Sequence, residues 1–284
     1  MTDVEEALTL REVLEVVEGL YPPSTAQSWD QVGLVTGDLD QPVRRIHLAV
    51  DPTLDVIREA RDAGADLLLT HHPLLLRGVH AVATTTAKGA AVTDLVVGDV
   101  ALYVAHTNAD VALQGVCAAL AEACGLDASE PLTWSEGQPL GRVGDLPEAE
   151  PLHVLVERLA GRLPATAGGV RVSGPPGAMV RRVALLGGAG DDLFDAVRSS
   201  GADVYVTADL RHHPALEARE EARGAVPYLV DAGHWASEQV WLPMAERALL
   251  DALGEDATKV DTHISTVRTD PWTFVVGASE GGMP

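Results

Sequence analysis

Six side chains with the chemistry of metal ligands lie in three short segments of the sequence. Each segment directly follows an apolar run that we expect to be a β-strand, at 66–70, 101–105 and 228–230. Proteins built from parallel strands and helices keep their chemistry where strands leave the sheet, so we expect the three segments to serve one site. The candidate ligands are His71, His72, His106, Asp110, His234 and Glu238.

The spacing within each segment supports this interpretation. His106 and Asp110 are four residues apart, as are His234 and Glu238, so one helical turn would place each pair on one face. Adjacent residues of a strand point to opposite faces, so His71 and His72 can serve one cluster only if the chain turns there. A lone histidine at a strand end is more often a hydrogen-bonded structural residue. The occurrence of all three segments together favours a metal site.

The number of ligands favours two ions over one. Four neutral imidazoles and two carboxylates exceed the needs of a single divalent ion, and two ions with a charge of +4 would retain about +2. A pair of metals is the arrangement used for hydrolytic displacement. Nitrogen and oxygen ligation without thiolate suits Zn, Fe or Mn better than Ca or Mg. We therefore expect two divalent metal ions, Zn, Fe or Mn.

The chain contains two similar stretches, 43–70 and 180–207, which align without a gap at an offset of 137 residues. Ten of the 28 aligned positions are identical. His71 and His72 correspond to Ala208 and Asp209, so the second copy lacks the histidine pair. The pair His212-His213 follows four residues later, and its members could line a cavity as proton carriers or cap a helix.

Each copy has the pattern strand, helix, strand, which favours parallel strands joined by a right-handed crossover. We expect an α/β fold of two related α/β domains from an internal duplication, with the dinuclear site between them or at the strand carboxyl ends. The expected first domain comprises 1–125 and a returning segment, 231–284. The stretch 126–150, rich in Pro, Gly and acids, is the expected linker to a second domain at 151–230. Further expected elements are helices at 10–20, 115–123 and 237–253 and a late strand at 272–276.

Composition limits the classes of partner. The formal net charge is −22 and only two residues are lysines, so broad electrostatic binding to nucleic acid is disfavoured. No apolar run reaches the roughly 18–20 residues that span a bilayer, and the first residues lack a secretory-signal pattern, so we expect no membrane association and a cytoplasmic protein. Cys117 and Cys124 share a helical stretch and are expected to be buried apolar residues rather than a disulfide or metal pair.

Five motifs, in order, resemble the NGG-one-interacting-factor-three-like family, often labelled GTP cyclohydrolase 1 type 2 homolog. They are Ser28-Trp29-Asp30-Gln31-Val32-Gly33-Leu34, His71-His72-Pro73, His106-Thr107-Asn108-x-Asp110, Thr207-Ala208-Asp209 with His213, and Gly233-His234-x-x-Ser237-Glu238. The resemblance covers nearly the whole chain. Gln31 stands where the family usually has Asn and Ala208 where it usually has Gly, and neither is a proposed ligand.

This resemblance implies a two-domain α/β subunit with a dinuclear metal centre, assembled as a homohexameric ring or barrel with its sites facing an interior cavity. By motif position, the same six residues carry over as ligands. Asp30 is implied to lie close behind a ligand; the alternative is that Asp30 caps a turn and Trp29 anchors packing. His213 is a second candidate for this supporting position, and no residue is assigned as catalytic.

Two functions fit these observations. The first is a metal-dependent hydrolase that acts on a nucleotide, a phosphoester or a cyclic amide, which includes the ring opening of GTP that the family label suggests. The second is non-enzymatic: metal storage or delivery, or a ring-forming scaffold.

Overall fold

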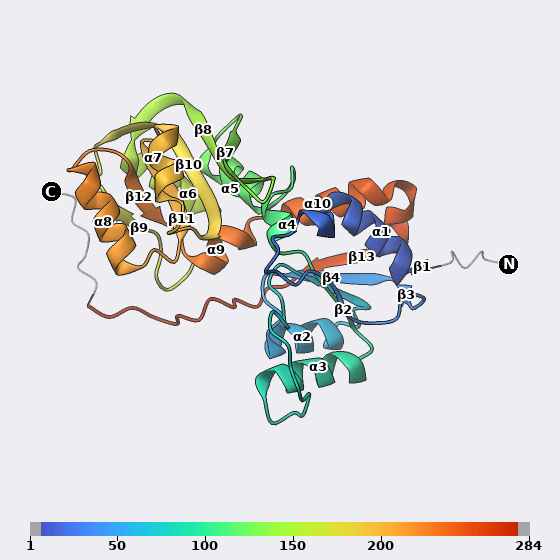
Figure 1. The fold of residues 1–284 in the computed structure, drawn as a ribbon. Helices are drawn as coiled ribbons and strands as arrows, with labels where there is room; N and C mark the ends of the chain where they lie inside the picture. The colour runs from blue at the N-terminus through green and yellow to red at the C-terminus, as the bar shows by residue number, and fades with distance from the viewer. Residues whose placement is uncertain (1–6, 278–284) are drawn as a thin grey trace. The chain divides into compact units, whose positions relative to one another are not determined.

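The computed structural model describes residues 7–277, and the chain divides into two compact units (Figure 1). Within the described residues, unit 1 is formed by the chain up to Gly115 together with Leu242–Thr269. Unit 2 is formed by Val116–Trp241 together with the described residues from Asp270 onward. Both units are mixed α/β structures, as expected. None of the described helices has the length and apolar character needed to cross a bilayer.

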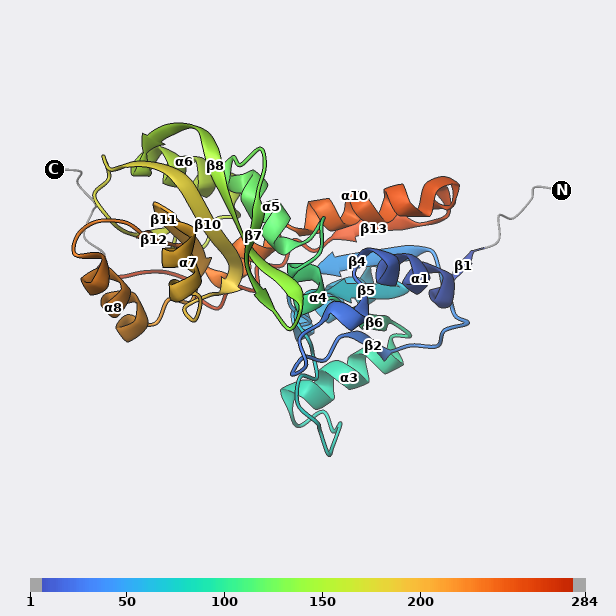
Figure 2. The ribbon, with the colours of Figure 1, turned by 45° about the horizontal axis from the view of Figure 1, so that its top comes forward.

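Unit 1 is built on a five-stranded sheet in the order β13-β4-β5-β6-β2. The first four of these strands are parallel and β2 is antiparallel to β6. Helices α2 and α3 pack together over one face, whereas α1 and α10 cover the other (Figures 1 and 2).

The strands are β2 (Gly33–Thr36), β4 (Arg45–Ala49), β5 (Leu67–Thr70), β6 (Ala101–Val104) and β13 (Asp261–Ile264). The helices are α1 (Leu10–Leu20), α2 (Leu54–Asp62), α3 (Ala87–Val97), α4 (Thr107–Asp110) and α10 (Leu242–Leu253). Short elements are β1 (Leu8–Thr9), which pairs with β3 (Pro42–Val43), and the 3-10 helices η1 (Pro23–Thr25) and η2 (Gly254–Lys259).

Local sequence accounts for these elements. Helix α1 begins with the expected capping box, in which the Thr9 side chain accepts from the Glu12 amide and the Glu12 side chain accepts from the Thr9 amide. Strands β5 and β6 are buried along their whole length because helices cover both faces of the sheet. Their continuous apolar sequence therefore fixes them in the middle of unit 1.

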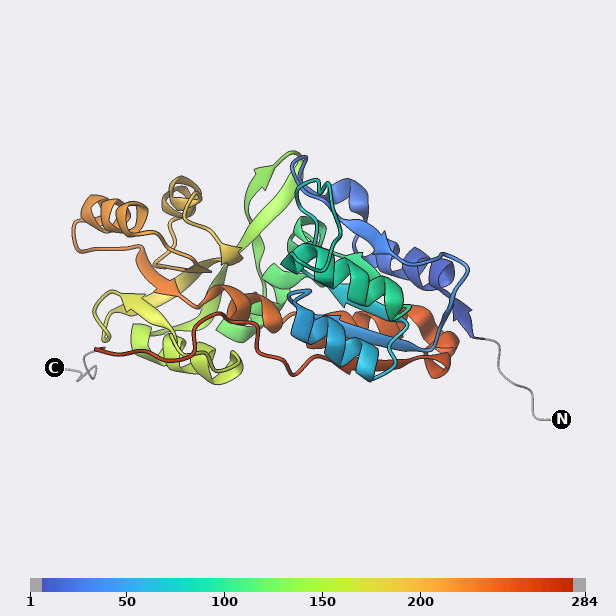
Figure 3. The ribbon, with the colours of Figure 1, turned by 90° about the horizontal axis from the view of Figure 1, so that it is seen from below.

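Unit 2 is built on a six-stranded sheet in the order β7-β8-β10-β11-β12-β9. Strands β10, β11 and β12 are parallel, and the remaining pairings are antiparallel. Helices α7 and α8 lie over one face and α6 over the other (Figure 3). The strands are β7 (Glu130–Ser135), β8 (Gln138–Pro151), β9 (Arg171–Ser173), β10 (Met179–Ala189), β11 (Val204–Ala208) and β12 (Tyr228–Asp231). The helices are α5 (Val116–Cys124), α6 (Leu152–Arg162), α7 (Phe194–Ser200), α8 (His212–Ala222) and α9 (His234–Gln239).

The two similar stretches of sequence form equivalent βαβ units. In β4-α2-β5 the strands pair with Ile46 opposite Leu67, and in β10-α7-β11 they pair with Val183 opposite Val204, 137 residues further on. Asp66 Oδ2 accepts hydrogen bonds of 2.7 and 2.9 Å from two successive backbone amides at the start of β4. Asp203 Oδ2 accepts bonds of 2.8 and 2.9 Å from the corresponding amides of β10. The similarity thus extends to individual hydrogen bonds.

The stretch expected to be a linker, 126–150, instead contains most of the hairpin β7-β8, which is part of the unit 2 sheet. Glu136 and Gly137 between the two strands both have positive φ, which is the backbone of a tight two-residue hairpin turn. The divisions between the units also differ from the expected boundaries and fall after residues 115, 241 and 269.

The C-terminal part differs from expectation in three places. The helix expected at 237–253 is two helices, α9 and α10, because Pro243 lies in the first turn of α10 and has no N–H to continue a helix across it. No strand forms at 272–276, where the apolar side chains are exposed, Phe274 to 75%. Strand β13 was not predicted, because its four residues are largely polar. Cys117 and Cys124 are both buried on α5, as expected.

Candidate metal centre

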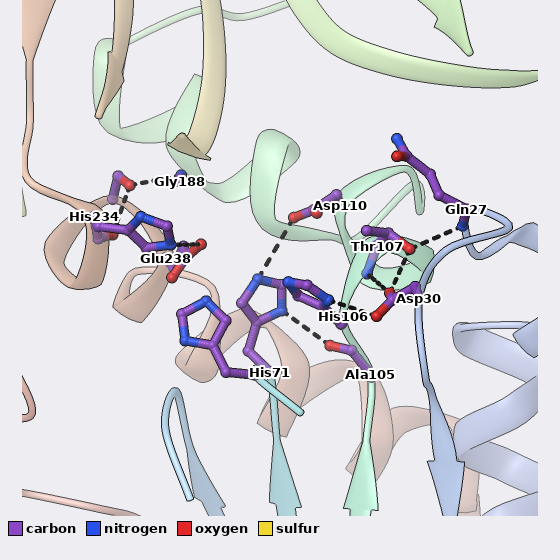
Figure 4. Close-up of polar contacts among 12 residues, drawn as sticks. Gln27, Asp30, His71, Ala105, His106, Thr107, Asp110, Gly188, His234 and Glu238 are labelled. Carbon is purple, nitrogen blue, oxygen red and sulfur yellow. Dashed lines mark hydrogen bonds and ion pairs between the residues drawn. The ribbon is translucent and has the colours of Figure 1, made fainter. Parts of the chain in front are cut away.

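Three histidines form a compact cluster at the carboxyl ends of β5 and β6 in unit 1 (Figure 4). His71 and His72 directly follow β5, and His106 follows β6. Their ring centroids are 4.9 to 5.5 Å apart, and one ring nitrogen from each lies within 4.8 Å of the others. The parallel pairing of β5 with β6 brings these strand ends together, so the cluster is a direct consequence of the topology.

The chain bends at His71 and His72, as the adjacent pair requires. The Thr70 hydroxyl donates to the His72 carbonyl at 3.1 Å, and this contact closes the bend. Both imidazoles therefore lie in one cluster although they are neighbours in sequence. Asp110 ends α4, one turn after His106, and its Oδ1 lies 3.6 Å from His71 Nε2.

Each histidine of the cluster directs its Nδ1 to an oxygen acceptor. A neutral imidazole that donates from Nδ1 presents the lone pair of Nε2, and such contacts are the usual support of histidine ligands. In this arrangement Nε2 of all three rings is the nitrogen that would bind a cation. The three contacts are His71 Nδ1 with the Ala105 carbonyl at 2.9 Å, His72 Nδ1 with Asp51 Oδ1 at 2.7 Å, and His106 Nδ1 with Asp30 Oδ1 at 2.9 Å.

Asp30 is buried behind His106 and is held by the start of α4. Its Oδ2 accepts from the Thr107 amide at 3.0 Å and from the Thr107 hydroxyl at 2.6 Å (Figure 4). Burial alone raises the pKa of Asp30, but the hydrogen bonds from His106 and Thr107 outweigh burial and hold this pKa well below its usual value. Asp30 is therefore an ionised acceptor for His106. Trp29 is half exposed and makes an edge contact with the His106 ring, so it is not a buried packing anchor.

A second pair of candidate ligands lies on α9 in unit 2. His234 Nε2 is 3.1 Å from Glu238 Oε1, one helical turn away, and Glu238 is buried (Figure 4). His234 Nδ1 contacts Asp209 Oδ2 at 2.8 Å, which repeats the arrangement of the unit 1 histidines. Asp209 occupies the position that corresponds to His72 in the sequence alignment. The stretch in unit 2 thus carries a carboxylate where the similar stretch in unit 1 carries a histidine.

Gly188 at the end of β10 leaves room for this pair. A Cβ at this position would lie 2.5 Å from Glu238 Oε1 and 3.3 Å from His234 Nε2, and its φ of +67° is unfavourable for other residues. The Gly188 amide also donates to Ser237 Oγ at 2.9 Å, and Ser237 Oγ donates to the His234 carbonyl. The first turn of α9 is therefore fixed against the end of β10.

The six candidate ligands thus form two groups: His71, His72, His106 and Asp110 in unit 1, and His234 and Glu238 in unit 2. Asp30 contacts the candidate ligand His106. His213 lies exposed in the first turn of α8, and neither it nor His212 caps that helix through its side chain. Asp51 and Asp209 were not predicted as supporting residues, although each lies at the end of a predicted strand segment.

The donor set fits a borderline transition metal ion. It combines imidazole nitrogens whose tautomer is fixed with carboxylate oxygens, and it contains no thiolate. A cavity of about 310 Å³ adjoins His72 in unit 1 and makes this part of the cluster accessible. It is lined by Asp51, Pro52, Thr53, Leu54, His72, Pro73, Leu74, Ala87, Lys88 and Ala91.

Residues 8–271 match the model of the Duf34/NIF3 (NGG1p interacting factor 3) family, and the chain belongs to this family. The resemblance found in the sequence is therefore confirmed. Among curated proteins, a GTP cyclohydrolase 1 type 2 homolog of Streptomyces coelicolor is 46% identical over 275 residues, which cover 95% of each chain. A protein of the same name from Mycobacterium bovis is 34% identical, with 94% of this chain and 97% of that protein covered.

The fold is also found among solved structures. A Bacillus cereus protein related to NIF3 superposes with a TM-score of 0.86 at 26% sequence identity, covering 95% of this chain and all of that one. The α/β architecture of this chain is thus that of NIF3-related proteins.

Proposed function

We propose that this protein is a metal-dependent hydrolase with a dinuclear centre. The observation that carries the proposal is shared by all four candidate histidines. Each directs Nδ1 to an oxygen acceptor at a distance of 2.7 to 2.9 Å, so Nε2 is the nitrogen that would bind an ion. Contacts of this kind are the usual support of histidines that bind metal ions.

The proposed centre uses all six candidate ligands for two divalent ions, Zn, Fe or Mn. The unit 1 histidines and Asp110 supply four groups, and His234 and Glu238 supply the other two. When bound, the ions would activate a water molecule and stabilise negative charge on the substrate. The imidazoles are oriented by four oxygen acceptors of the chain: Asp51, Asp30, Asp209 and the Ala105 carbonyl. The cavity beside His72 leaves this part of the centre open. We further propose that the two equivalent βαβ units descend from an internal duplication.

The substrate class is proposed from the cavity beside His72. Lys88, one of the two lysines of the chain, lines this cavity and is exposed in the first turn of α3. In a protein with a net charge of −22, a cation at the cavity wall favours a substrate with a phosphate or another anionic group. A nucleotide or phosphoester therefore fits better than a neutral cyclic amide. The names of the curated relatives make GTP one candidate.

The test is a screen of the full-length protein reconstituted separately with Zn, Fe and Mn, against GTP, other nucleotides, model phosphoesters and cyclic amides. We expect turnover with at least one metal and its loss in His71→Ala, with the exposed His80→Ala as the control. No turnover with any metal, together with rapid exchange of bound metal, would instead support metal storage or delivery in the cytoplasm. A homohexameric ring, proposed from the family resemblance, is compatible with either function and would be tested by the mass of the assembly in solution.

A further inference from the structure

A second group of potential metal ligands lies in unit 1, formed by residues that have no part in the candidate metal centre. It comprises His47 on β4, Glu59 on α2 and His263 on β13. One ligand atom from each lies within 4.8 Å of the others. The cluster joins three elements, one of which, β13, belongs to the returning C-terminal segment.

The topology explains why two histidines meet here. Strands β4 and β13 are parallel neighbours, and His47 and His263 are directly paired in their register. Paired residues of neighbouring strands place their side chains on the same face of the sheet, and the two ring centroids are 4.8 Å apart. Helix α2 covers this face and brings the Glu59 carboxylate to the pair, so that Oε2 lies 3.0 Å from His47 Nε2.

His47 has the properties expected of a metal ligand. Its side chain is 0% exposed, and its Nδ1 has no hydrogen-bond partner among the described residues. Buried polar atoms are seldom left unsatisfied. The Glu59 carboxylate accepts from the Nε2–H of this ring, so the neutral imidazole presents the lone pair of Nδ1. Burial, together with the neighbouring His263, lowers the pKa of His47 despite the opposing effect of Glu59. A neutral imidazole is the form that binds metals.

Glu59 is positioned by the chain that follows β13. Its carboxylate accepts from the Ser265 hydroxyl at 2.5 Å and from the amide and hydroxyl of Thr266 at 3.4 and 3.3 Å. Burial raises the pKa of Glu59, but the hydrogen bonds from Ser265, His47 and Thr266 outweigh it and lower the pKa overall. An ionised carboxylate therefore faces two imidazoles.

We propose that His47, Glu59 and His263 form a mononuclear site for a zinc-like divalent ion, distinct from the dinuclear centre. Tetrahedral Zn ligands lie about 3.3 Å from one another, so no pair of ligand atoms needs to close by more than about 1.5 Å. The exposed His263 can provide this movement by a change of rotamer. Two imidazoles and one carboxylate leave the fourth position to water. The ion fastens β13 to β4 and α2, across more than 200 residues of sequence.

The experiment uses the full-length protein in which His71→Ala and His106→Ala disable the candidate centre. Zn²⁺ is titrated into the metal-free protein in competition with a chromophoric chelator. We expect one bound equivalent that disappears, or weakens at least tenfold, when His263→Ala is added. His80→Ala, which removes another exposed histidine of unit 1, leaves this equivalent unchanged.

Thermal unfolding supplies an independent measurement. An ion that binds only the folded chain raises the Tm, here by about 5 °C at saturating Zn²⁺, and the rise is absent in the His263→Ala background. His263 is exposed, so its replacement leaves the metal-free Tm unchanged. Equal Zn²⁺ binding and an equal Tm rise with and without His263 would overturn the proposal, as would the absence of any Zn²⁺ equivalent in the disabled protein. Neither result bears on the dinuclear centre, whose ligands differ.

Discussion

His106 Nδ1 lies 2.9 Å from Oδ1 of Asp30, whose other carboxylate oxygen is held by the amide and hydroxyl of Thr107. The residue that orients His106 is thus itself fixed by the first residue of α4, the helix that also carries Asp110. Two of the proposed ligands therefore depend on one buried carboxylate.

Replacement of Asp30 tests this dependence. We expect Asp30→Asn to weaken metal binding about 10- to 100-fold, because an amide supports the histidine less well than a carboxylate does. The measurement is a competitive Zn²⁺ titration of the purified variants. Asp38→Asn, which changes an exposed aspartate of the same unit, is the control. Equal metal affinity in both variants would show that Asp30 does not support the site.

The pKa of Asp30 gives a second measurement, on the metal-free protein. Because this pKa is lower in the folded chain than its unfolded value of about 4, the ionised carboxylate stabilises the fold above that pH. The contribution is lost as the pH falls toward the folded-state pKa. In urea unfolding at a series of pH values, the stability difference between the unaltered protein and Asp30→Asn should narrow as the pH is lowered below 4. A difference that is constant or grows on acidification would contradict the assignment.

Gly188 gives a prediction for the α9 pair. Gly188→Ala places a methyl group 2.5 Å from Glu238 Oε1, so we expect it to lower metal occupancy as well as stability. Gly201→Ala is a matched control, because Gly201 has a similar φ of +70° but no atom within 4 Å of the added Cβ. Both changes should cost about 1–2 kcal/mol of stability from backbone strain. Only Gly188→Ala should lose metal; equal metal content in the two proteins would count against a ligand role for Glu238.

Lys88 is predicted to bind the anionic part of the substrate. We expect Lys88→Ala to weaken the binding of inorganic phosphate to the metal-loaded protein about fivefold, the effect typical of one exposed charge. Calorimetry with phosphate as the probe measures this change. The other lysine, Lys259, is paired with Asp256 in η2, and Lys259→Ala should leave phosphate binding unaltered. An equal effect of the two changes would indicate general electrostatics instead of a binding contact.

The sequence predicted the parts of this molecule that depend on local patterns. Apolar runs placed β5 and β6, and the residues that follow them could be assigned to one cluster because parallel strands end at one edge. The supporting carboxylates were harder to find. Asp51 reaches His72 across 21 residues and Asp209 reaches His234 across 25, so both contacts depend on strand register.

The elements that sequence reasoning missed have different physical origins. The hairpin β7-β8 is rich in glycine and proline, as linkers are. What distinguishes it from a linker is the turn at Glu136-Gly137, where both residues have positive φ. Strand β13 is polar and short, and it is held by pairing with β4 instead of by apolar burial. β8 pairs with β10 and β13 pairs with β4. In both cases hydrogen bonding to another strand determines the secondary structure more than local composition does.

The central claim, that six residues hold two ions, is tested most directly by the metal content of purified protein. Elemental analysis should find about two transition metal ions per chain, and the double variant His72→Ala, Glu238→Ala should retain none. The control is His153→Ala, Glu157→Ala, which removes a histidine and a glutamate four residues apart on α6. Unchanged metal content in the His72/Glu238 variant, or equal losses in the two double variants, would contradict the proposed centre.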